Sequence, residues 1–217
     1  MSFTLTLAEA ETYLRKCARA TGLSWGLAEE AGKASRWLAA FSMPGPEMVL
    51  AHLQNLQGKN YADFIPDSQA EPWQALGGTI CPIIAGAAIA DRSAQMREGK
   101  VFRLGKTAYP LLLAATIGQA ARYHQTVFTT LWADVAVSCF ENGFSIDGNI
   151  DDLLFTEAVS VTCQLGDLTT PQQLPKTTAY TLADSPWQAI DALAFKTYAP
   201  ATAESRAGAG AGLTDND

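Results

Sequence analysis

The spacing of apolar residues changes once along this chain, and that change limits the folds it can adopt. Up to about residue 60 the apolar residues recur every three or four positions, which is the period of an amphipathic helix. From residue 127 to 137 they alternate with a period of two, as in a strand, and Asn142-Gly143 is a strong hairpin signal. Helices followed by hairpin-connected strands predict an α+β fold, with N-terminal helices packed against a mainly antiparallel sheet.

Caps and breakers divide the helical part. Thr6 and Glu9 form a T-x-x-E capping box before the first helix, which is expected to end near Gly22. Ser24 can cap a second helix, since its hydroxyl can accept from the free amides of a first turn. The segment 43–46 (MPGP) ends that helix, and a short third helix follows.

The later elements are mostly apolar. Pro110 begins a helix to about Arg122 that is apolar on nearly all sides and should be buried. Residues 80–89 suit a buried strand, although a buried helix fits the same run. The other expected elements are strands near 101–104, 127–137, 144–146, 159–164 and 177–182, and a final helix that Asp184 or Ser185 caps and that stops before Pro200. We expect one domain over residues 1–217, with a helical part over about 1–60, a sheet-containing part over about 75–200 and a glycine-rich tail over 201–217.

Composition excludes several classes of protein. The chain of 217 residues is 48% hydrophobic and 17% charged, with a formal net charge of −7. This acidic balance argues against nucleic acid as a partner, because phosphate contacts need clustered positive charge. The low charged fraction predicts either a large core or apolar surface covered by a second subunit, so we expect a homo-oligomer.

The sequence also predicts where the protein resides and in what state its cysteines are. The longest uncharged apolar stretches, 79–90 and 107–118, are shorter than the roughly 20 residues that cross a bilayer, so no membrane span is expected. The first residues lack the pattern of a signal peptide, which predicts a cytoplasmic protein. Four widely separated cysteines and two histidines predict reduced, buried thiols and no zinc site. No cofactor can be assigned.

The C-terminal tail is open to two interpretations. Three glycines are followed by a polar cluster, a composition that is typical of a mobile end. Alternatively, the freed backbone amides approach an anion, while the carboxylates bind a cation or dock on arginines. On that second interpretation the candidate ligand-binding residues are Arg206, Gly208, Gly210, Gly212, Asp215 and Asp217.

The segment 91–106 is locally basic in an acidic protein, with five lysines and arginines. Such a run is typical of a solvated loop or of a strand edge that charge protects from pairing. The alternative is that Arg92 and Arg103 bind an anionic metabolite or the carboxylates of the tail.

Two residues are weak catalytic candidates. His124 follows the expected buried helix and could lie near Cys139 or Glu141, although the sequence does not bring them together. Asp134 would share a sheet face with Phe128 and Trp132 if the strand 127–137 is continuous, which would raise its pKa. The contrary interpretation is that Asp134 faces solvent.

Trp25 is a further candidate for ligand binding. It stands at the expected start of the second helix, where free amides suit an anion.

Two stretches resemble an uncharacterised bacterial family that is known only as a domain of unknown function. One is Gly22–Gly32 (GLSWGLAEEAG) followed by Arg36-Trp37-Leu38, and the other is the ending 205–217 (SRAGAGAGLTDND). The segment 81–91 is similar as well. The resemblance implies membership of a family without an assigned reaction, and it favours an ordered, functional tail.

These observations lead to two functional hypotheses. The first is a cytoplasmic protein that binds a small anionic metabolite at a site including the basic segment and the tail. The second is a non-catalytic homo-oligomeric assembly protein whose tail contacts a neighbouring subunit. The sequence leaves open whether the protein is an enzyme.

Overall fold

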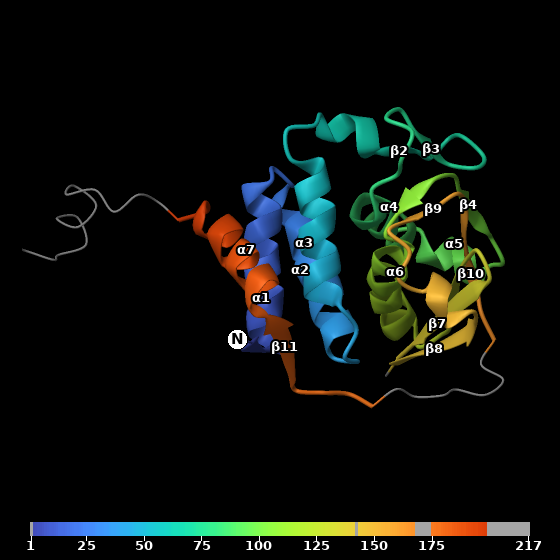
Figure 1. Ribbon diagram of the computed structural model, residues 1–217. Coiled ribbons are helices and arrows are strands. Elements are labelled where there is room, and N and C mark those ends of the chain that lie inside the picture. Colours follow the sequence, from blue (N-terminus) through green and yellow to red (C-terminus); the bar gives the residue numbers. More distant parts are fainter. Residues whose placement is uncertain (1, 142, 168–174, 199–217) are drawn as a thin grey trace, which may run out of the picture.

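The computed structural model describes residues 2–141, 143–167 and 175–198. Its helices are α1 (Leu7–Ala20), α2 (Trp25–Ala39), α3 (Gly45–Leu56), α4 (Pro82–Ala90), α5 (Ser93–Arg97), α6 (Pro110–His124) and α7 (Asp184–Phe195). Its strands are β1 (Ser2–Thr6), β2 (Pro66–Asp67), β3 (Gln74–Ala75), β4 (Phe102–Leu104), β5 (Thr107–Ala108), β6 (Phe128–Trp132), β7 (Val135–Phe140), β8 (Gly143–Gly148), β9 (Glu157–Ala158), β10 (Val161–Leu165) and β11 (Ala179–Ala183). The predicted α+β class is confirmed, and Figure 1 shows the elements in two groups.

The first group contains α1, α2, α3 and α7 (Figure 1). Thr6 caps α1 as predicted: its hydroxyl accepts from the Glu9 amide at 3.2 Å, and the Glu9 carboxylate accepts from the Thr6 amide at 2.8 Å. The structure adds β1 before this cap, and β1 pairs with β11 in antiparallel register. The end of the described chain therefore returns to its beginning.

The second group is built on a five-stranded antiparallel sheet in the order β4-β10-β6-β7-β8. Helix α6 packs on this sheet, where the Cys139 thiol reaches the Ala114 carbonyl at 3.4 Å, and it is buried along most of its length, as predicted. The cysteines 17, 81, 139 and 163 are free and buried. Among the described residues no helix is long and apolar enough to cross a membrane.

The strand favoured for residues 80–89 is wrong and the alternative of a buried helix is confirmed, because most of this run forms the helix α4. Pro82 supplies the first helical residue, where its missing N–H costs nothing. The run is apolar on all sides, so it carries no period that would separate a strand from a helix. Burial of the whole segment in the tertiary structure, and not its local sequence, therefore determined that it is a helix and not a strand.

The long strand expected at 127–137 is also wrong, because the chain reverses at Ala133 and Asp134. Trp132 pairs with Val135, so the two halves of the run pair with each other as β6 and β7. Ala133 adopts the left-handed conformation (φ 43°) that a tight hairpin needs. The turn has neither the glycine nor the asparagine from which such a hairpin is usually predicted. Asp134 is therefore exposed at a turn and does not lie on a sheet face beside Trp132.

The final helix begins at Asp184, one or two residues earlier than predicted. Ala183 is the residue that precedes α7, and Asp184 already belongs to the helix. Asp184 instead accepts a hydrogen bond from the Gln188 side chain at 2.9 Å.

Candidate functional site

Helices α4 and α6 run side by side in the same direction. Just before they begin, the Ile80 amide donates to the Lys106 carbonyl at 2.8 Å, and the Ala108 amide donates to the Ile80 carbonyl at 3.1 Å. Midway along, Gly86 lies against Thr116. Just beyond α4, Ser93 reaches His124, the last residue of α6, at 2.8 Å. The carboxyl-terminal ends of both helices therefore lie together.

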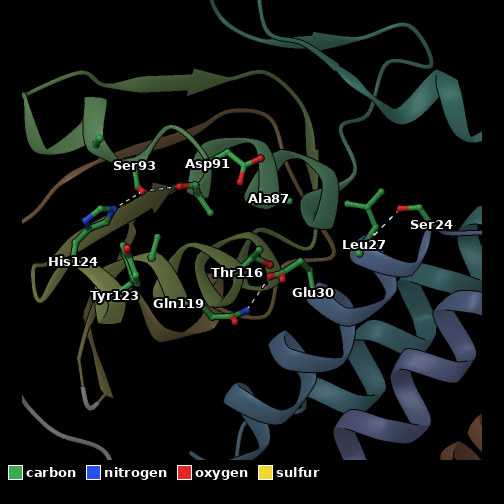
Figure 2. Close-up of a pocket in the computed structure, with 14 residues that line it drawn as sticks. Ser24, Leu27, Glu30, Ala87, Asp91, Ser93, Thr116, Gln119, Tyr123 and His124 are labelled. Carbon is green, nitrogen blue, oxygen red and sulfur yellow. Dashed lines mark hydrogen bonds between the residues drawn. The ribbon is translucent and has the colours of Figure 1, made fainter.

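A pocket of about 710 Å³ opens at these carboxyl-terminal ends, between them and the start of α2 (Figure 2). It is lined from the first group of elements by Ser24, Gly26, Leu27 and Glu30, and from the second by Ala87, Ala90, Asp91, Ser93, Ala94, Thr116, Gln119, Ala120, Tyr123 and His124. The pocket thus forms only where the two groups of elements meet.

The fixed charge at this pocket is negative. Asp91 and Glu30 line it, and the last carbonyls of α4 and α6 add the negative ends of two helix dipoles. Glu30 is already engaged, since it pairs with Lys33 at 2.8 Å and accepts from Gln119 at 3.2 Å. Asp91 is exposed, and its carboxylate forms no ion pair with the described residues. The pocket therefore offers the carboxylate of Asp91, which has no ion pair in the part of the chain that the structure describes, beside that of Glu30, which is paired with Lys33 and Gln119.

His124 is held on the pocket wall by Ser93. The Ser93 hydroxyl donates its hydrogen to the Ala90 carbonyl at 2.6 Å, so its contact with His124 Nε2 requires the imidazole to be the donor. This arrangement fixes the ring and leaves the Ser93 oxygen without a base that could take its proton. A serine nucleophile would need the opposite polarity, with the imidazole accepting.

The other candidates from the sequence lie in several places. Trp25 begins α2 next to two pocket residues, but its ring is 67% exposed and lies under the Arg19 guanidinium at 4.4 Å. Asp134 is at the β6–β7 turn, where its amide donates to Asp152 at 3.1 Å.

The two arginines of the basic segment serve a neighbouring part of the chain. Arg92 donates to the Ala88 carbonyl at 2.8 Å and lies over the Trp73 ring at 5.6 Å. Arg103 pairs with Glu71 at 3.6 Å. Both side chains are directed to the segment before β3, and neither lines the pocket in Figure 2. The tail candidates Arg206, Gly208, Gly210, Gly212, Asp215 and Asp217 lie outside the described residues.

Sequence reasoning missed Asp91, Glu30 and Gln119 as pocket residues. One signal was available in α6, where Thr116, Gln119 and Tyr123 follow one another at spacings of three and four on a helix whose other residues up to Ala121 are apolar. A polar stripe on a buried helix indicates a hydrated face. Nothing in the local sequence connects this stripe to Asp91, which is distant in the chain.

Comparison with known proteins assigns no activity. No curated protein and no solved structure matches the chain. Residues 5–81 match the model of a family described as "Protein of unknown function (DUF3726)". The resemblance to a domain of unknown function is thereby confirmed for a stretch that includes α1, α2 and α3 and ends at Cys81.

Proposed function

We propose that the protein binds a small, amine-bearing metabolite in the pocket between α2 and the ends of α4 and α6. The observation that carries this proposal is the Asp91 carboxylate, which has no ion pair among the described residues, beside Glu30, at two helix ends that are themselves negative. Alanines and the Tyr123 ring supply apolar surface for the hydrocarbon part of such a ligand. A few polar groups in a mainly apolar hollow of this volume are typical of small-molecule sites.

This ligand carries a positive charge, whereas the basic segment suggested an anionic ligand. Arg92 and Arg103 contact other partners, and none of the five lysines and arginines of that segment lines the pocket. A homo-oligomer and a cytoplasmic location remain proposals from the sequence. Native mass spectrometry of the purified protein would report the number of subunits and any retained ligand in one measurement.

The proposal is tested with two pairs of probes, phenethylamine against 2-phenylethanol and butylamine against butanol. Each pair shares its hydrocarbon part and differs in the ammonium. NMR titration of the backbone amides should show saturable shifts at Asp91, Ala94 and Gln119 with the amines and none with the alcohols.

Asp91→Asn should weaken amine binding about tenfold, the worth of one charge-assisted hydrogen bond. Asp134→Asn is the matched control, since it removes the same charge from an exposed turn away from the pocket. Equal binding of amines and alcohols, no binding of either amine, or amine affinity unaffected by Asp91→Asn would contradict the proposal.

A further inference from the structure

A second cavity, of about 310 Å³, lies at the opposite ends of α4 and α6, where both helices begin. It is lined by His52, Asn55, Leu56, Lys59, Phe64, Thr79, Ile80, Ala108, Tyr109, Thr156 and Glu157. Thr79 and Ile80 lead into α4, and Ala108 and Tyr109 lead into α6. Because the helices are parallel, the positive ends of both dipoles lie at this cavity, while His52, Asn55 and Leu56 bring the negative end of α3 to it.

Neither helix has a side-chain hydrogen bond that caps its first turn. Each begins instead with a proline, which removes one of the free amide groups. The field of the helix ends is therefore not already cancelled by a capping carboxylate.

Of the two oppositely charged side chains that line the cavity, Glu157 is already in an ion pair and Lys59 is in none among the described residues. The Glu157 carboxylate is engaged on both oxygens, by Lys106 at 2.8 Å and by the Thr79 hydroxyl at 3.3 Å. Lys59 lines the cavity, and the structure gives it no ion pair among the described residues. Its ammonium lies 5.7 Å from the centre of the Phe64 ring. A ligand group in the cavity would thus meet a lysine whose charge is not yet balanced.

Tyr109 has a hydroxyl hydrogen to donate. Asn55 donates to the Tyr109 oxygen at 3.4 Å, so the phenolic hydrogen is not used in that bond. Burial raises the pKa of Tyr109, which keeps that hydrogen in place. The backbone of Tyr109 is left-handed (φ 41°), a conformation that costs energy for a residue with a side chain and that clusters at functional sites.

His52 lines the cavity with a ring that is held on one side by a hydrogen bond to Cys81. Its side chain is 2% exposed and lines the cavity, and its hydrogen bond runs from Nε2 to the Cys81 sulfur at 3.2 Å. Burial raises the pKa of the Cys81 thiol, so the thiol keeps a hydrogen that it can donate to Nε2. With the thiol as the donor, the ring hydrogen resides on Nδ1, and no hydrogen bond joins Nδ1 to the described residues.

We infer that this cavity binds an oxyanion, the carboxylate or phosphate group of a small ligand. Lys59 supplies the charge, and the Tyr109 hydroxyl and His52 Nδ1 supply directed hydrogen bonds. The cavity is near the lower limit for ligand sites, so it takes a group of few atoms. This site is distinct from the amine pocket, which lies at the other ends of the same two helices.

The test uses acetate and inorganic phosphate as probes, with chloride at equal ionic strength as the reference. NMR titration of the intact protein should show saturable shifts at Thr79, Ile80 and the His52 ring with one or both probes. Shifts with acetate alone identify a carboxylate site, and shifts with phosphate alone identify a phosphate site.

Lys59→Met keeps most of the apolar stem and should weaken binding about tenfold. Tyr109→Phe should weaken binding several-fold, while Lys196→Met, an exposed lysine on the other group of elements, should have no effect. Absence of saturable shifts with both probes, or affinities unchanged in both Lys59→Met and Tyr109→Phe, would overturn the inference. Since the amine titration follows Asp91, Ala94 and Gln119, either proposal can fail without the other.

Discussion

Gly86 of α4 packs directly against the Thr116 side chain of α6. A Cβ atom added to Gly86 would lie 2.6 Å from Thr116 Cβ, which is nearer than real Cβ contacts allow. Thr116 is fixed in turn, because its hydroxyl donates to the Leu112 carbonyl at 2.9 Å within α6. At this point the absence of a side chain on Gly86 lets α4 approach α6 closely.

Gly86→Ala should destabilise the protein by about 1–3 kcal/mol, because the helices must separate to admit the methyl group. Chemical denaturation measures this change. Gly26→Ala is the matched control: Gly26 is also helical, and no heavy atom lies within 4 Å of its added Cβ. Equal stability of the two variants would show that the close approach of α4 and α6 does not limit the packing.

The neutral His52 should make stability depend on pH. Burial lowers its pKa from 6.5 to about 4, so between these values the unfolded chain binds a proton that the folded chain does not. Stability is therefore full above pH 6.5 and falls as the pH drops toward 4, by about 3 kcal/mol from this residue.

Denaturation at several pH values measures that loss, and His52→Gln should flatten the profile in this window. NMR of the His52 ring gives a direct reading in the native protein. A ring that becomes protonated near pH 6.5 while the fold is intact would contradict the expectation.

The buried cysteines should be unreactive in the folded protein. Burial raises the pKa of Cys17 and of Cys163 to about 12 and also raises the pKa of Cys81 and Cys139, which suppresses the thiolate that alkylating agents need. Iodoacetamide at pH 8 should modify none of them in native buffer and all of them in denaturant, as read by intact mass. A cysteine placed at exposed Ser185 is the positive control, and rapid native labelling of a wild-type cysteine would refute the prediction.

The capping box of α1 should contribute measurably to stability. Thr6→Ala removes the hydroxyl that accepts from the Glu9 amide and should cost about 1 kcal/mol. Thr6→Ser keeps the acceptor and should retain most of the stability. If both variants lose the same free energy on denaturation, the loss comes from the Thr6 methyl group and not from the cap.

The sequence by itself determined the elements whose signals are local. The Thr6–Glu9 box and Ser24 predicted where α1 and α2 begin, because a cap satisfies amides within the same few residues. The hairpin signal at Gly143 predicted the pairing of β7 with β8, which closes with Phe140 opposite Gly143. Pro110 and the apolar run after it predicted the buried helix α6.

Tertiary structure decided the rest. Whether residues 82–90 form a helix depended on packing, because that apolar run carries no period. Where the run 127–137 turns was also decided by packing, because its period of two continues through the turn without a glycine or asparagine. Both cavities likewise join residues far apart in sequence, such as Glu30 with Asp91 and His52 with Tyr109. Local patterns report hydrogen bonds between near neighbours, whereas these sites exist only once α4 and α6 lie parallel and α2 and α3 pack against them.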